Sequence, residues 1–208
     1  MAASGLVLMG FVVMHLSGNL LIFLGPGPYN AYAKKLRDLG PLLWVARAFL
    51  LAAAIAHVWT SVRLARENRA ARPVGYRVSR PVRTTRSART MMASGLLLLA
   101  YVVYHLLHFT FHMTNPEFAQ LVDPMGHRNV YAMVVQAFQR RGVVVIYLAA
   151  MALLCAHLSH GIASAPQTLG VANEKTLAMW GAVGRIAAFA LFIGYSAIPV
   201  AVILGMVR

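Results

Sequence analysis

The sequence has few cysteine and acidic residues. Its 208 residues include one cysteine, Cys155, and five acidic residues. A single thiol excludes an internal disulfide and a cysteine-ligated iron–sulfur cluster within this chain. The C-x-x-C-H motif is also absent, so a bound haem would be held by ligands and packing rather than by covalent bonds.

Long hydrophobic runs dominate the chain instead. Hydrophobic residues make up 60% of it, charged residues 12%, and the mean hydropathy is +0.67. Crossing a bilayer takes about 20 mostly apolar residues, and five stretches qualify. We therefore predict an all-α integral membrane protein, a five-transmembrane-helix bundle forming one domain over residues 1–208, with spans at about 2–24, 41–64, 91–111, 142–164 and 177–207.

Within these spans, two kinds of residue are scarce. None contains Asp or Glu, so we predict no carboxylate path for protons through the membrane. The only proline well inside a span is Pro199, which argues against the broken helices of many transporters. The first span lacks a basic leader and a small-residue cleavage site, and we interpret it as a retained helix.

The net charge of +14 is concentrated in one connection. Nine arginines fall between Arg63 and Arg89, around the link from the second to the third span. Basic loops mark the cytoplasmic side, which predicts the N-terminus inside and the C-terminus outside. The other connections oppose this only weakly, with Lys34, Lys35, Arg37, Arg128, Arg140 and Arg141. The pattern favours a membrane topology signal over nucleic-acid binding, and contact with anionic lipid or an acidic partner stays open.

Four histidines, one in each of the first four spans, are the main functional signal. They are His15, His57, His105 and His157. Histidine is costly to bury unpaired in a membrane, and neutral imidazole is a common axial ligand of haem iron. Four such residues can hold two bis-histidine haems, so we predict two b-type haems; histidines satisfied by interhelical hydrogen bonds are the alternative.

An internal repeat and a depth count pair these histidines in the same way. SGLVLMGFVVMHLSGN from Ser4 aligns without gaps on SGLLLLAYVVYHLLHF from Ser94, which sets His15 opposite His105. A looser match between AHVWTSV and AHLSHGI sets His57 opposite His157. At 1.5 Å per residue, the first pair lies about 20 Å from the inner ends of the spans and the second about 10 Å. One haem is therefore expected near each leaflet.

Other histidines offer alternative ligands. His108 and His112 share a helical face with His105, and His160 shares one with His157. Exchanging His105 for His108, or His157 for His160, would move a ligand by about 4.5 Å. The repeat favours His105 and His157. His127 lies in a connection and carries no specific signal.

In order along the chain, these stretches resemble the five-helix dihaem cytochrome b membrane anchor of succinate dehydrogenase and fumarate reductase. The resemblance rests on HLSGNLLIFLGPGPYNAYAKKLRDLGPLLWVAR from His15, AHVWTSVRLARENRAARPVGY from Ala56 and HLSHG from His157. It implies that His15 and His105 hold a distal haem, while His57 and His157 hold a proximal one. The family usually has a short segment before the first helix, whereas here the first span begins at about residue 2.

The resemblance also implies partners and a role. Such anchors dock a flavoprotein subunit and an iron–sulfur subunit on the cytoplasmic face of a bacterial cytoplasmic membrane. They pass electrons between iron–sulfur clusters and a membrane quinone, commonly menaquinone, and the partner flavoprotein carries out the dicarboxylate chemistry. The chain would thus be the non-catalytic, electron-transferring subunit of an enzyme complex, and the arginine-rich loop a part of its docking surface.

Arginines and polar groups near the predicted haems have candidate roles. Arg47, in a W-x-x-R sequence that resembles a position near the distal haem, and Arg185 could each meet a haem propionate; snorkelling to the interface is the alternative for Arg185. Weaker propionate candidates are Ser17, Asn19, Thr60 and Ser61. Candidate glycines for close porphyrin or helix approach are Gly5, Gly10, Gly18 and Gly95. A quinone site beyond the outer haem would use Tyr29, Asn30, Tyr32, His108 and His112, with an inner site as its competitor.

Two other classes remain open at this point. One is a cytochrome b anchor of a different quinol-linked oxidoreductase, such as a nitrate reductase or hydrogenase. The other is a haem-free transporter or assembly scaffold. A reduced-minus-oxidised absorption spectrum separates the haem proteins from the second class.

Overall fold

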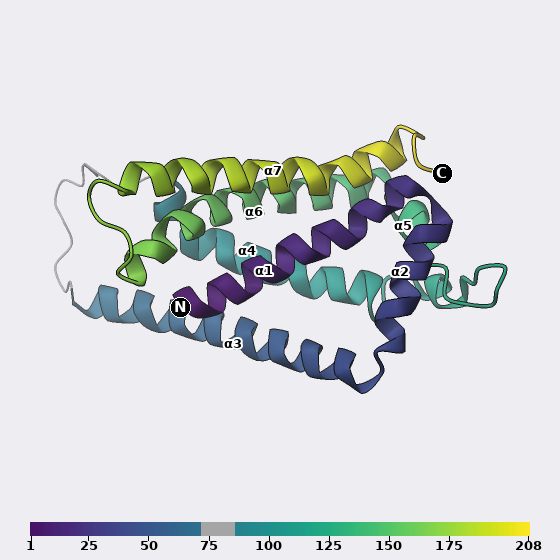
Figure 1. Cartoon of the computed structure of the whole chain (residues 1–208), viewed down its shortest axis with the longest axis horizontal. Coiled ribbons are helices and arrows are strands. Elements are labelled where there is room, and N and C mark those ends of the chain that lie inside the picture. The colour runs from purple at the N-terminus through teal and green to yellow at the C-terminus, as the bar shows by residue number, and fades with distance from the viewer. Residues whose placement is uncertain (72–85) are drawn as a thin grey trace.

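The computed structural model describes residues 1–71 and 86–208 and is helical in nearly all of this part (Figure 1). Five of its helices are long and apolar enough to cross a membrane. They are α1 (Ala2–Asn19), continued by the 3-10 helix η1 (Leu20–Leu24), α3 (Pro41–Ala70), α4 (Arg86–Phe109), α6 (Arg141–Thr168) and α7 (Leu177–Ile203). The all-helical, five-span prediction is thus confirmed, and the chain is a multi-pass membrane protein.

The ends of the long helices differ from those expected. The second and fourth helices run on to Ala70 and Thr168, and the third begins at Arg86. These extensions carry charged or polar side chains. Hydropathy detects only the apolar part of a helix, and a helix can continue beyond the apolar layer. The fourth helix therefore includes Pro166 near its end, in addition to Pro199 inside α7.

Two short helices not expected from the sequence lie at one end of the bundle. They are α2 (Pro26–Asp38) and α5 (Val130–Phe138), accompanied by the 3-10 helix η2 (Pro116–Gln120). Figure 1 shows α2 running across that end. We call it the α2/α5 end, and the opposite one, where α3 finishes and α4 begins, the arginine-loop end. The N-terminus lies toward the arginine-loop end and the C-terminus at the α2/α5 end (Figure 1).

Glycine–proline steps set the boundaries of α2. Gly25 has φ 96° and Gly40 has φ 55°, values that side-chain-bearing residues rarely adopt. Each is followed by a proline in the first turn of the next helix, where a missing N–H costs nothing. The chain therefore changes direction sharply on both sides of α2, which lays this helix across the bundle end instead of along it.

The long helices pack unequally. Helices α6 and α7 approach so closely that a Cβ on Gly184 would lie 2.5 Å from the carbonyl oxygen of Ser159. Helix α1 packs on α7, where the hydroxyl of Tyr195 donates to the carbonyl of Val12 at 2.6 Å. Helix α3 buries none of its residues and lies along one edge of the bundle (Figure 1). The tight core is thus on the α6/α7 side, and α3 is the loosely packed helix.

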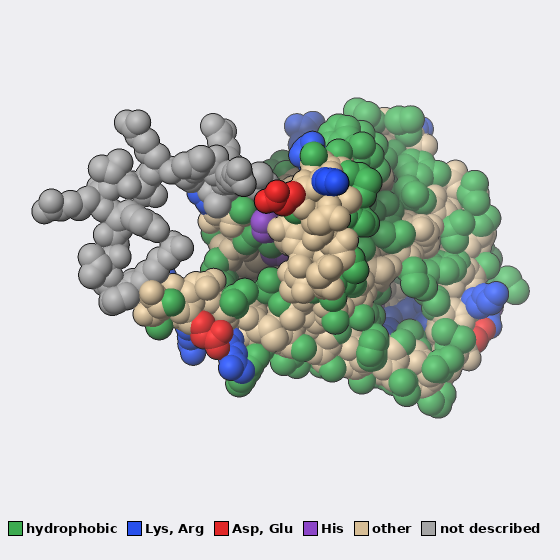
Figure 2. Space-filling view, turned by 60° about the vertical axis from the view of Figure 1, so that its left-hand side comes forward, with side chains coloured by type: hydrophobic (Ala, Val, Ile, Leu, Met, Phe, Trp, Pro, Cys, Tyr) green, Lys and Arg blue, Asp and Glu red, His purple; other side chains and the backbone are tan. Residues whose placement is uncertain are grey.

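The surface has the distribution expected of a membrane protein. Figure 2 shows hydrophobic side chains spread over the flank of the bundle, with Lys and Arg side chains lying mainly toward its ends. Part of the nine-arginine cluster, Arg72, Arg77, Arg80 and Arg83, lies outside the described residues. The direction in which the bundle crosses the membrane stays a prediction.

Candidate functional site

The structure brings the four span histidines together in two pairs. His15 on α1 and His105 on α4 have ring centroids 5.9 Å apart, with ring planes at 89°. His57 on α3 and His157 on α6 have centroids 6.4 Å apart, with planes at 66°. All four rings are partly buried. These are the two pairs that the repeat and the depth count indicate.

Both spacings fit a metal ion held between two imidazoles. A metal–imidazole nitrogen bond is about 2 Å long, so two rings on opposite sides of one ion have centroids about 6 Å apart. In the described residues, no group of three or more His, Cys, Asp or Glu side chains gathers to hold a metal ion. Two histidine nitrogens can hold a metal ion only where another group fills its remaining coordination positions, as a porphyrin does around haem iron. The pairs fit haem and do not fit a bare ion.

Serine hydroxyls fix the orientation of the His57 and His157 rings. The Oγ of Ser4 lies 3.5 Å from Nδ1 of His57, and the Oγ of Ser94 lies 3.2 Å from Nδ1 of His157. Both hydroxyls donate their proton to a main-chain carbonyl, so each oxygen is left to accept from the ring. With the ring proton on Nδ1, the lone pair of Nε2 is free for a metal ion. We call His57 and His157 the serine-linked pair.

Glycines beside these serines leave room for the same two rings. A Cβ on Gly5 would lie 3.3 Å from Cε1 of His57, and one on Gly95 would lie 3.4 Å from Cε1 of His157. The Ser–Gly step thus recurs at equivalent places in the two copies of the repeat. In the first copy it faces His57, and in the second it faces His157. The glycines were candidates for close approach, but their histidine neighbours could not be predicted from composition.

The other pair is held differently. The hydroxyl of Tyr147 on α6 lies 3.2 Å from Nδ1 of His105 and 3.1 Å from Nδ1 of His108. One hydroxyl can accept from the first ring and donate to the second, which leaves Nε2 of His105 available. Phe11 stacks on His15 at 5.3 Å between centroids. We call His15 and His105 the tyrosine-linked pair; sequence reasoning missed Tyr147, for which no motif gave a signal.

The alternative ligands lie away from the partner histidines. His108 is fully buried and packs on Phe109 with centroids 4.3 Å apart, and its ring makes no contact with His15. No ring contact joins His160 to His57. His127 lies 3.7 Å from a carboxylate oxygen of Asp123 in the connection before α5. The geometry therefore favours His105 and His157 over their neighbours.

The propionate candidates are mostly engaged elsewhere. Ser17, Thr60 and Ser61 donate to carbonyls of their own helices, and Asn19 donates to the carbonyl of His15 at 2.7 Å. Arg185 is exposed, and its Nη1 lies 3.5 Å from a Cβ position on Gly181, one turn nearer the arginine-loop end. This orientation favours snorkelling toward that end.

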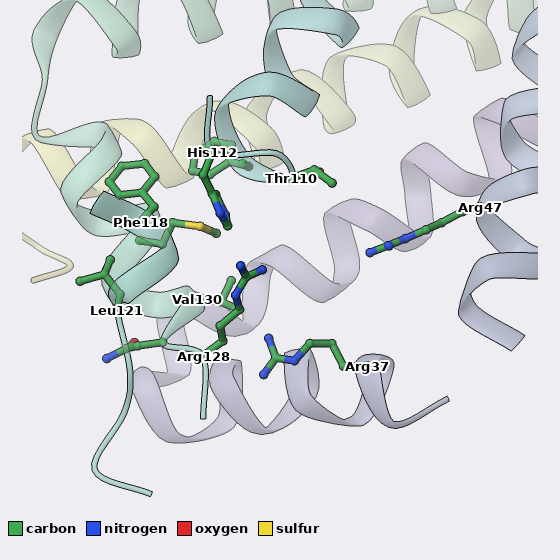
Figure 3. A pocket seen from close by; sticks show the side chains of 11 residues that line it. Arg37, Arg47, Thr110, His112, Phe118, Leu121, Arg128 and Val130 are labelled. Carbon is green, nitrogen blue, oxygen red and sulfur yellow. The ribbon is translucent and has the colours of Figure 1, made fainter. Parts of the chain in front are cut away.

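Most of the quinone candidates are also engaged in contacts within the chain. Tyr29 donates to Asn19 at 2.7 Å, Asn30 donates to Asn129 at 3.0 Å, and the Tyr32 ring covers Gly18. These contacts tie α2 to its neighbours. Of the five candidates, only His112 lines the cavity of about 180 Å³ at the α2/α5 end, which Arg47 also lines (Figure 3).

No protein-family model, curated protein or solved structure matches this chain. The two histidine pairs and the sequence patterns around them are therefore the features of this chain that bear on its function.

Proposed function

We propose that this chain is the dihaem cytochrome b anchor of a succinate:quinone oxidoreductase, of the succinate dehydrogenase or fumarate reductase type. The observation that carries the proposal is the presence of two histidine pairs at haem-ligand spacing, at different depths in one five-helix bundle. The chain itself would move electrons, and a partner flavoprotein would oxidise succinate or reduce fumarate.

The residues would hold each haem by two axial imidazoles. His15 and His105 would ligate one, and His57 and His157 the other. When bound, haem supplies reversible one-electron transfer. Ser4 and Ser94 keep the Nδ1 proton of the serine-linked pair in place, and Tyr147 orients His105. These hydrogen bonds also raise the basicity of the ligands.

The spacing of the two sites suits electron transfer along the bundle. Ser94, which contacts His157, and His105 lie on the same helix and are 11 residues apart, which is about 16 Å of helical rise along α4. Ser4 and His15 repeat this separation on α1. The apolar flanks of the helices keep water and charged groups away from both histidine pairs. Electrons would therefore pass from one end of the bundle to the other through the two sites.

The partners follow from the proposed topology. The arginine-loop end would face the cytoplasm of a bacterial cell, placing the N-terminus inside and the C-terminus outside the cytoplasmic membrane. The iron–sulfur and flavoprotein subunits would dock there, against the arginine-rich connection. The quinone, in this proposal menaquinone, would react near the tyrosine-linked pair.

Two alternatives predict different observations. An anchor of a nitrate reductase or hydrogenase type would share the haems but copurify with other subunits. A haem-free transporter would lack haem altogether, and no observation favours it, since Pro166 and Pro199 lie near helix ends and not at midplane.

The test is purification of the chain with its native partners in mild detergent. The proposal expects haem b, copurifying flavoprotein and iron–sulfur subunits, and succinate-linked reduction of a quinone. Haem b with a molybdenum or nickel subunit would support the second quinol-linked class instead. A complex without haem b would refute the proposal.

A further inference from the structure

Three arginines converge on the cavity at the α2/α5 end. Arg37 comes from α2, Arg47 from α3 and Arg128 from the connection before α5, so three separate segments supply them. Figure 3 shows the three side chains entering from different sides, with His112 and Phe118 above them. The cavity is therefore strongly cationic.

No carboxylate neutralises these three charges within the described residues. At this end Asp38 pairs with Lys34, and Glu117 pairs with Arg140 at 3.0 Å. Asp123 accepts from the backbone amides of its own loop. Glu67 and Glu174 lie toward the other end of the long helices. Since each acidic residue near the cavity has another partner, the arginines are left to attract an anion from outside the chain.

His112 adds a second, uncharged polar group. It is 6% exposed, and its Nε2 has no hydrogen-bond partner in the described structure. Its backbone has φ 54°, which turns the chain at the end of α4 and aims the ring at the cavity (Figure 3). Burial, and then the charge of Arg128, lowers the pKa of His112, while a hydrogen bond to the backbone of Phe109 raises it. The neutral ring donates its one N–H in a hydrogen bond to the Phe109 carbonyl, so Nε2 is left as a hydrogen-bond acceptor.

The cavity lies at the level where the spans end. Arg47 is six residues from the start of α3, about 9 Å along the helix, and Trp44 lies beneath its guanidinium at 4.9 Å. Trp44 is 68% exposed, as expected of an interfacial tryptophan that faces lipid headgroups. Arg47 and Arg128 are exposed and Arg37 is partly buried, so the three arginines are within reach of headgroup phosphates.

Phe109 links this cavity to the tyrosine-linked pair. Its ring lines the cavity and also contacts the ring of His105, with centroids 5.6 Å apart. Phe109 is therefore a shared neighbour of the cavity and of the tyrosine-linked pair. The apolar walls around the arginines suit the uncharged part of an amphiphilic ligand.

We propose that this cavity binds the headgroup of an anionic glycerophospholipid, phosphatidylglycerol being the type. The phosphate accepts from Arg37, Arg47 and Arg128, and a glycerol hydroxyl donates to Nε2 of His112. A neutral quinone offers no anion to the three arginines, and inorganic phosphate leaves the apolar walls exposed. The site is independent of the proposed redox function.

The experiment uses the full chain, purified with whatever subunits accompany it in mild detergent. Tightly retained lipid is counted by native mass spectrometry after exchange against deuterated phosphatidylglycerol, phosphatidylserine or phosphatidylcholine. The variants are Arg37→Gln, Arg47→Gln and Arg128→Gln, singly and together, and His112→Ala. Arg141→Gln, the same charge change on an exposed residue at the same end, is the matched control. Haem is quantified in every sample.

We expect one phosphatidylglycerol per chain. Each arginine change should weaken retention roughly 5-fold and the three together about 100-fold. Arg141→Gln should retain the lipid, and His112→Ala should lose the preference for phosphatidylglycerol over phosphatidylserine. Equal retention of phosphatidylcholine, or equal loss in Arg141→Gln, would overturn the proposal. So would displacement by millimolar phosphate or by a quinone, or loss of the lipid together with the haem in a His105→Ala variant, which would assign the arginines to propionates.

Discussion

The two histidine pairs share one spacing but differ in their surroundings. The serine-linked pair, His57 and His157, is held by two equivalent Ser–Gly steps on two helices. The tyrosine-linked pair, His15 and His105, lies among aromatic rings and receives one hydroxyl, from Tyr147, on one side only. One pair is symmetric and polar around the rings, and the other is asymmetric and aromatic.

This difference shows which part of the site the repeat duplicates. The ligand positions and the Ser–Gly steps occur in both copies, whereas Tyr147 has Arg47 at the equivalent place ten residues before the histidine of the other helix. Because hydrogen bonds and solvation around a ligand tune a haem, two sites with the same ligands but different surroundings are expected to differ in reduction potential. The side chains that contact the histidines therefore distinguish two sites that have the same pair of ligands.

The largest expected effect comes from removing a ligand. His57→Ala or His157→Ala should abolish haem binding at the serine-linked pair and leave the other site loaded, and His15→Ala or His105→Ala should do the reverse. Pyridine haemochrome assays on the four variants would each give half of the wild-type haem content. His108→Ala and His160→Ala are the matched controls and should keep both haems; loss of a haem in either control would reassign the ligands.

A smaller effect is expected from filling the space beside the serine-linked rings. Gly95→Val puts a branched side chain where even a Cβ would lie 3.4 Å from the ring of His157, so this ring must shift from its ligand position. We expect partial loss of one haem, measured as the ratio of the two components in a redox titration. Gly142→Val, where a Cβ would have no neighbour within 4 Å, serves as the control. Loss of the tyrosine-linked component instead would contradict the geometry.

The smallest effect should come from the hydroxyl groups. Ser94→Ala should weaken haem retention at the serine-linked pair by about 10-fold, and Tyr147→Phe should do the same only at the other pair, since outer-shell partners orient the ligands without binding the metal ion. Haem-transfer rates to apomyoglobin would report both. Ser17→Ala, whose hydroxyl only bonds its own helix, is the control. An equal response of both sites to either change would mean that the hydroxyls act through general stability.

The sequence predicted the large features of this fold because hydrophobicity determines them. Runs of apolar residues located the five long helices, and the repeat together with helical rise indicated which histidines would meet. The search for apolar runs missed α2 and α5, since short helices at a membrane surface have no long apolar run. It also placed the start of the third helix too late, because Arg86 and Arg89 are helical despite their charge.

The contacts around the histidines were beyond such reasoning. The Ser–Gly steps were visible in the repeat, yet the partner of each serine depends on the angle between packed helices. Tyr147 comes from a helix face that no motif marks. Tyr29 and Asn30 have suitable groups for a quinone, but they bond Asn19 and Asn129 because α2 folds across the bundle end. Likewise, the meeting of Arg37, Arg47 and Arg128 needs three segments far apart in the sequence.

The central claim is that the two histidine pairs each hold one haem b. Quantitative pyridine haemochrome analysis of the purified wild-type chain, normalised to protein by amino-acid analysis, tests it most directly. The account predicts two haem b per chain, with two components in a reductive titration. Absence of haem b, or a single haem that survives substitution of each of the four histidines, would contradict it.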